Sequence, residues 1–195
     1  MPDRRVVASP GPMPRLPGDE GIWVLIFGDM LVFSIFFITF FVYRMQEHEV
    51  FVAGHALLDV RLGALNTLLL LTSSLFIALA TRAVRHAHPF AARWIAAAIG
   101  CGICFCAVKA FEYGHKIAAG ITLNTTDFFT FYYMYTGIHL VHVLVGLGVL
   151  MLLYRRVHGA VEPSTTIKLV ESGGSFWHLV DLLWIVMFPL FYLVR

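Results

Sequence analysis

The stretch that decides the fold is the last one, Ser175 to Arg195, which reads SFWHLVDLLWIVMFPLFYLVR. It is long and apolar enough to cross the hydrocarbon core of a bilayer, which takes about 20 residues of helix. His178 and Asp181 are three residues apart near its start, so a helix places both on nearly the same face. Because lipid penalises a buried charge by roughly 3 kcal/mol, other parts of the chain must cover that face.

The composition is that of an integral membrane protein. Of the 195 residues, 59% are hydrophobic and 13% are charged, whereas soluble domains have about 25% charged residues. The net charge of +2 and the absence of a Lys/Arg run give no indication of nucleic acid as a partner. Cys101, Cys104 and Cys106 fall within one apolar segment beside Gly100 and Gly102, which favours close helix packing over a disulfide framework.

The rest of the chain supplies the helices that the last one needs. Residues 1–21 hold five of the eight prolines and are predicted to form a disordered cytosolic tail. We expect residues 22–195 to form one all-α domain, a polytopic membrane protein with a bundle of five transmembrane helices. The expected spans cover residues 22–43, 64–81, 92–117, 128–154 and 175–195.

The distribution of basic residues predicts the orientation. Outside the spans or near their ends, nine Lys and Arg residues lie on the side of the N-terminal tail and four on the other side. By the positive-inside rule, the N-terminus is then cytosolic and the C-terminus periplasmic. We therefore expect a multi-pass protein of the bacterial inner membrane.

Glu112 and His115 have the E-x-x-H spacing that places two ligands on one helix face in di-iron bundles. Such a site also needs a second pair and two further carboxylates. The chain offers only the reversed pair His178 and Asp181, so the ligand set is incomplete and we expect no metal site.

His139 and His142 are the candidate haem ligands. They lie on one helix, about 4.5 Å apart along its axis, whereas axial ligands usually come from different helices at matched depth. We interpret both imidazoles as interhelical hydrogen-bonding groups and expect this chain to bind no redox cofactor.

Two polar clusters are expected inside the bundle. Toward the outer side, Glu112 should pair with Lys109 or with a histidine of the next helix, because an unpaired charge there is costly. Toward the cytosolic side, Asp29 lies about 12 Å into the first span and should face the interior near His178 and Asp181. Proton handling and a purely structural hydrogen bond both remain open for Asp29.

Five motifs in order carry a family resemblance: GIWVLIFGDMLVFSIFFITFFVYR, LNTLLLLTSS, KAFEYGHK, FYYMYTGIHLVHVLVGLGVL and FWHLVDLLWIVMFPLFYL. Over nearly its whole length after the tail, the chain resembles subunit III of the haem-copper oxidases. It is most similar to the short five-helix form associated with nitric oxide reductase. Asp29 stands where many members have glutamate, and Leu140 where many have glycine.

The resemblance implies a non-catalytic subunit of an oxidoreductase complex of respiratory electron transport. It implies no bound haem or copper, a catalytic haem-bearing subunit I (of an oxidase or a nitric oxide reductase) as partner, and a V-shaped cleft that holds phospholipid. It also links the acid-bearing helix to proton supply. The alternatives are a self-sufficient membrane haem or di-iron enzyme and a transporter. The residues assigned as interior polar or proton-linked are Asp29, Glu112, His115, His139, His142, His178 and Asp181, and those assigned to the lipid cleft or to packing are Asn66, Trp177 and Trp184.

Overall fold

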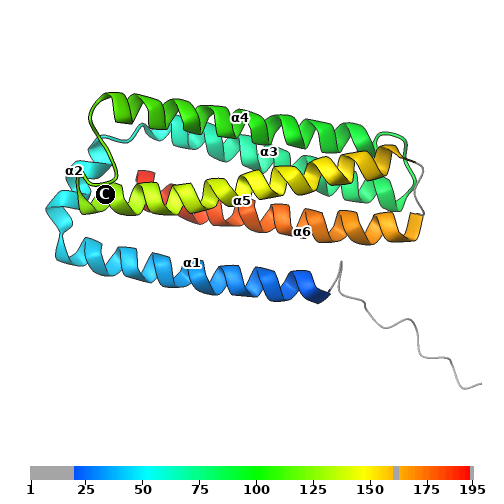
Figure 1. Ribbon diagram of the computed structural model, residues 1–195, viewed down its shortest axis with the longest axis horizontal. Coiled ribbons are helices and arrows are strands. Elements are labelled where there is room, and N and C mark those ends of the chain that lie inside the picture. The colour runs from blue at the N-terminus through cyan, green and yellow to red at the C-terminus, as the bar shows by residue number, and fades with distance from the viewer. Residues whose placement is uncertain (1–19, 160–162, 194–195) are drawn as a thin grey trace, which may run out of the picture.

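The computed structural model describes residues 20–159 and 163–193, so most of the predicted tail lies outside the described residues. Five long helices run side by side along the long axis of the molecule (Figure 1). In chain order the elements are α1 (Glu20–Gln46), α2 (His48–Ala56), α3 (Val60–Arg85), α4 (Ala91–Ala118), α5 (Asp127–His158), α6 (Pro163–Phe188) and the π-helix η1 (Pro189–Leu193).

The five long helices of the described residues are each long and apolar enough to cross a membrane. This confirms the predicted all-α, polytopic fold class. Two details differ from the expected spans. The first link contains the short helix α2, and α6 begins at Pro163 rather than near residue 175. Helix α2 is held by Phe51, which is fully buried and packs on Phe40 and Phe128.

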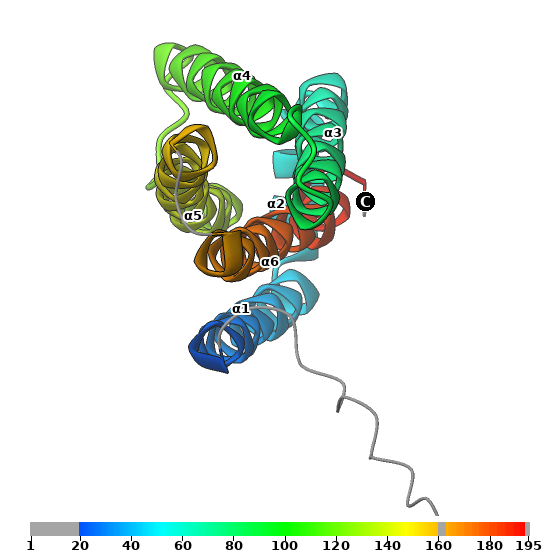
Figure 2. The same ribbon diagram turned by 90° about the vertical axis from the view of Figure 1, so that its right-hand side faces the viewer.

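Helices α3, α4, α5 and α6 form the body of the bundle, and α1 lies outside it, against α6 (Figure 2). Helix α1 buries one narrow stripe: Ile26, Phe33 and Phe40 recur every seven residues and are each at most 8% exposed. Its other faces are apolar and open; Val24, for example, is 75% exposed. In a bilayer these faces meet lipid or another membrane protein.

Trp177 of α6 joins all four helices of the body. Its indole Nε1 donates to Ser73 Oγ of α3 (3.0 Å), and Ser73 donates to the Ala98 carbonyl of α4 (2.9 Å). A Cβ atom at Gly102 of α4 would lie 3.0 Å from the Trp177 ring, and one at Gly146 of α5 would lie 2.7 Å from it. Both glycines are therefore needed so that the ring can fit between α4 and α5.

Candidate functional site

A buried ion pair occupies the end of the bundle that we expect to face outward. Lys109 Nζ lies 3.0 Å from Glu112 Oε2, and neither side chain is more than 2% exposed. Lys109 also donates to the hydroxyls of Tyr132 of α5 and Tyr192 of η1, at 3.0 Å each. Tyr192 in turn donates to Glu112 Oε1 at 2.8 Å. The predicted pairing of Glu112 with Lys109 is thus confirmed, and it joins three elements.

Aromatic rings surround the lysine of this pair. Lys109 Nζ lies 4.9–5.6 Å from the ring centroids of Tyr113, Tyr132, Trp184 and Tyr192. Cation–π attraction offsets part of the cost of removing an ammonium group from water. Sequence reasoning missed the two tyrosine partners, Tyr132 and Tyr192. Aromatic residues are so frequent in this chain that these two carry no distinguishing signal.

The inner face of α4 at this end consists of Lys109, Glu112 and Lys116, which are all buried. Lys116 continues the cluster by donating to the Leu57 carbonyl at 3.1 Å. His115 is exposed, so our assignment of this residue to the interior is wrong. The reason is helical rotation, because a residue three positions after Glu112 lies about 60° around the helix from it, on the side away from Lys116.

The arrangement does not favour metal ligation at Glu112. Both of its carboxylate oxygens are engaged, one by Lys109 and one by Tyr192. Within the part of the chain that the structure describes, no three His, Cys, Asp or Glu side chains gather as a metal site. The cluster is therefore suited to holding α4, α5 and η1 together rather than to binding or converting a substrate.

A second polar pair joins α1 to α5. His142 Nε2 lies 3.5 Å from Asp29 Oδ2, and the two side chains are 21% and 26% exposed. His142 Nδ1 lies 2.9 Å from the Ile138 carbonyl, which can only accept a hydrogen bond, so Nδ1 carries a hydrogen. His142 Nε2 is then the ring nitrogen that faces the carboxylate oxygen of Asp29, so the pair can hold one further proton between these two atoms.

The structure pairs Asp29 with His142 rather than with His178 or Asp181, which corrects the expected neighbours. The cause is the register of the antiparallel helices α1 and α5, in which Phe36 also stacks on Tyr135. Extending this register, α5 runs roughly 10 Å beyond the start of α1. Asp29 therefore lies deeper than its position in the sequence suggests.

His178 and Asp181 instead lie at the interface of α6 with α3. His178 Nδ1 is hydrogen-bonded to Ser74 Oγ at 2.5 Å, and Asp181 lies one helical turn further along α6 on nearly the same face. His178 is exposed on the surface of the bundle, so its assignment to the interior is wrong, whereas Asp181 is only 5% exposed. Its Oδ1 has no hydrogen-bond partner among the described residues.

His139 and Trp184 stack in the core with ring centroids 5.4 Å apart. Both ring nitrogens of His139 and both amide atoms of the buried Asn66 lack partners within the described residues, so the interhelical hydrogen bond expected of His139 is not found. Trp184 Nε1 donates to Thr67 at 3.0 Å. Asn66, Trp177 and Trp184 are all buried, so of their two proposed roles the structure places them in packing.

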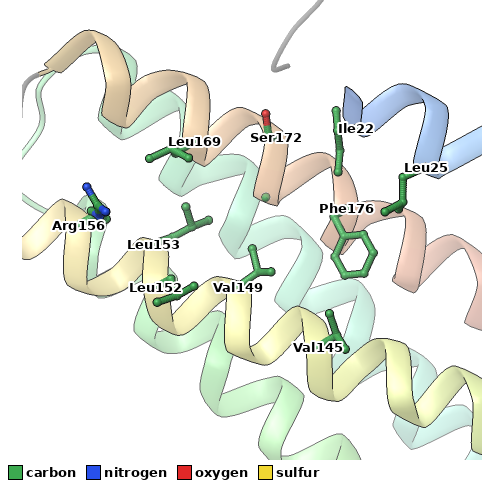
Figure 3. A pocket seen from close by; sticks show the side chains of 11 residues that line it. Ile22, Leu25, Val145, Val149, Leu152, Leu153, Arg156, Leu169, Ser172 and Phe176 are labelled. Carbon is green, nitrogen blue, oxygen red and sulfur yellow. The ribbon is translucent and has the colours of Figure 1, made fainter. Parts of the chain in front are cut away.

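An apolar groove of about 400 Å³ opens between α1, α5 and α6 (Figure 3). Along α5 it runs from Val145 to Arg156, a length of roughly 16 Å, close to half of the ~30 Å hydrocarbon core. The guanidinium of Arg156 stands at one end (Figure 3). The groove is lined by Ile22, Leu25, Val145, Val149, Leu152, Leu153, Arg156, Leu169, Ser172, Gly173 and Phe176.

Comparison with known proteins agrees with this architecture. A family model described as "Cytochrome c oxidase subunit III" matches residues 18–194. The chain is 29% identical over 181 residues to quinol oxidase subunit 3 of Bacillus subtilis (strain 168), covering 89% of this chain and 85% of that protein. It is 29% identical over 176 residues to cytochrome c oxidase subunit 3 of a Synechocystis strain, covering 89% and 74%.

A third relative is a longer protein. The chain is 28% identical over 190 residues to the heme-copper oxidase subunit I+III of Aeropyrum pernix. The match covers 94% of this chain but 23% of that protein.

Proposed function

Because this chain belongs to the cytochrome c oxidase subunit III family, we propose that it is the accessory subunit III of a respiratory haem-copper oxidase. In this role it binds no haem or copper, packs beside the catalytic subunit and supports its turnover and proton supply. The subunit I+III name of the Aeropyrum relative supports the partnership. The single observation that carries the non-catalytic role is the Lys109–Glu112 cluster, whose polar groups bond one another.

The experiment is purification of a tagged chain from its native membrane in mild detergent. We expect it to bring down a catalytic subunit with haem and copper, whereas the separated chain shows no Soret band. A Soret band, or stoichiometric iron, in the separated chain would support a self-sufficient redox enzyme instead. We propose oxygen as the acceptor because the relatives are oxidase subunits. Assaying the purified complex with oxygen and with nitric oxide distinguishes an oxidase from a nitric oxide reductase.

We propose that the Asp29–His142 pair is the proton-linked group of this subunit. A partly exposed pair of polar side chains is costly against lipid, so the α1–α5 face that carries it is a good candidate for the contact with the catalytic subunit. An imidazole nitrogen beside a carboxylate oxygen gives this pair the chemistry of a proton donor or acceptor.

Asp29→Asn tests this role. The change keeps the size of the side chain and removes the carboxyl group that could carry a proton, so the complex should assemble while its turnover rate or working lifetime falls several-fold. Ser34→Ala is the matched control, because Ser34 lies on the same helix and bonds the Met30 carbonyl of that helix. Unchanged turnover, lifetime and assembly in Asp29→Asn would contradict proton handling and leave a structural role for the pair.

The orientation is also a proposal. The nine-to-four distribution of basic residues supports a cytosolic N-terminus and a periplasmic loop between α4 and α5. A cysteine introduced at Thr122 in that loop should react with a thiol reagent from the periplasmic side. Reaction from the cytosolic side alone would reverse the assignment.

We further propose that the α1–α5–α6 groove holds one acyl chain of an anionic phospholipid from the cytosolic leaflet. The apolar lining of the groove suits an acyl chain, and its length is close to the thickness of one leaflet of the hydrocarbon core. The guanidinium of Arg156 suits the lipid phosphate. Arg156→Gln should lower the anionic lipid that co-purifies with the protein, as measured by mass spectrometry. Arg155→Gln removes the charge of the neighbouring residue, which does not line the groove, and should leave the lipid in place. Equal loss in both variants would indicate a general charge effect.

A further inference from the structure

A second groove differs from the first in being polar. It has a volume of about 460 Å³ and lies between the C-terminal part of α3 and the first half of α6. Near its mouth, Arg85 forms an ion pair with Glu171 at 2.9 Å, and Arg85 is 53% exposed. Lipid tails cannot satisfy such groups, so water is the expected filling. The lining residues are Ala78, Thr81, Arg82, Arg85, His86, Glu171, Gly174, Ser175 and His178.

The inner end of this groove leads to a buried carboxyl group. His178 lines the groove and is hydrogen-bonded to Ser74, and Asp181 lies one helical turn further along α6, on nearly the same face as His178. Asp181 Oδ1 is buried and has no partner among the described residues. Along α6, Glu171 and Asp181 are roughly 15 Å apart, which is half of the ~30 Å hydrocarbon core. Polar groups thus extend along α6 over a length of about half the hydrocarbon core.

We propose that this α3–α6 groove is a water-filled half-channel through which Asp181 exchanges protons with one membrane surface. In the relay, the imidazolium of His178 gives its Nδ1 proton to Ser74 Oγ, while Ser74 gives its own hydroxyl proton to the Asp181 carboxylate. The products are a neutral imidazole and a carboxylic acid, and the reverse step returns the proton to the water of the groove. A serine hydroxyl can serve in this way because it donates and accepts at once.

The path ends at Asp181 rather than crossing the membrane. Further along the α3–α6 interface, Trp184 is fully buried and its indole is hydrogen-bonded to Thr67. This aromatic ring blocks water from passing beyond Asp181. The other titratable groups beside the groove are Arg82 and Arg85 of α3, His86 directly after α3, and Glu171 of α6. Asp29 of α1 and His142 of α5 form their own pair.

Access of water is tested by cysteine labelling of the full chain in liposomes. The three native cysteines are first replaced by alanine, and single cysteines are introduced at Ser175 and His178. Matched controls are Leu182 and Ile185 of the same helix, which are exposed and apolar. A membrane-impermeant thiol reagent needs a hydrated thiolate, so the groove positions should react at least about tenfold faster. Equal rates at all four positions would overturn the proposal.

The relay itself is tested by infrared spectroscopy of the same liposomes. Asp181→Asn should remove one carboxylic C=O band, and transfer to D₂O should shift that band. His178→Phe and Ser74→Ala should each slow the shift at least about tenfold, since each removes one relay hydrogen bond. Thr72→Ala is the control, because Thr72 donates within its own helix to the Leu68 carbonyl. If Asp181→Asn removes no band, or if both relay variants exchange at the original rate, the proposal fails.

Discussion

Replacing Lys109 by methionine is expected to destabilise the folded chain by about 3–5 kcal/mol, the usual cost of removing one partner of a buried ion pair. The substitution leaves the Glu112 carboxylate, which is 2% exposed, without its bonded cation, since the remaining hydrogen bond from Tyr192 carries no charge. For a chain of this size, the midpoint of thermal unfolding in detergent should fall by roughly 10 °C.

The control for this prediction is the paired substitution Lys109→Met with Glu112→Gln. Because it removes both charges together, we expect it to destabilise less than Lys109→Met alone. Arg85→Gln breaks a partly exposed ion pair with Glu171 and should change stability by less than about 1 kcal/mol. If the destabilisation of the double variant equals the sum of those measured for Lys109→Met and Glu112→Gln alone, the two residues do not act as a unit.

The features predicted correctly from sequence are those that one helix fixes by itself. Hydropathy over about 20 residues gives the membrane helices, and the structure has five that qualify within its described residues. Lys109 and Glu112 are three residues apart, so their pairing needs no knowledge of any other helix. The short helix α2 was missed because it is stabilised by packing of Phe51 on distant aromatic rings.

The features that depend on the axial offset between two packed helices could not be predicted in this way. Asp29 meets His142 rather than His178 because α5 extends beyond the start of α1, and no single-helix pattern contains that offset. Likewise, Tyr192 reaches Glu112 from a segment 80 residues away along the chain. Such contacts depend on register and tilt, which are set by packing of the whole bundle.

Trp177→Ala is expected to lower stability by about 3–5 kcal/mol, because it empties the space between α4 and α5 and leaves a cavity. The loss also frees Ser73 from the indole Nε1, although Ser73 still bonds the Ala98 carbonyl. Unfolding in detergent, followed by circular dichroism, measures the change. A loss below about 1 kcal/mol would mean that the surrounding helices collapse onto the site.

The fit of this ring is tested more sharply by filling space than by emptying it. Gly146→Ala places a Cβ 2.7 Å from the Trp177 ring and should cost about 1–3 kcal/mol by overpacking. A Cβ at Gly148 of the same helix would meet no described atom within 4 Å, so Gly148→Ala should instead stabilise by up to about 1 kcal/mol through helix propensity. Trp177→Phe removes the six-membered ring of the indole, which the new Cβ at position 146 would contact. The destabilisation caused by Gly146→Ala should therefore be smaller in the Trp177→Phe variant. If Gly146→Ala destabilises the wild-type chain and the Trp177→Phe variant equally, the strain lies elsewhere. Contact between residues 146 and 177 would make the effects of the two substitutions depend on each other.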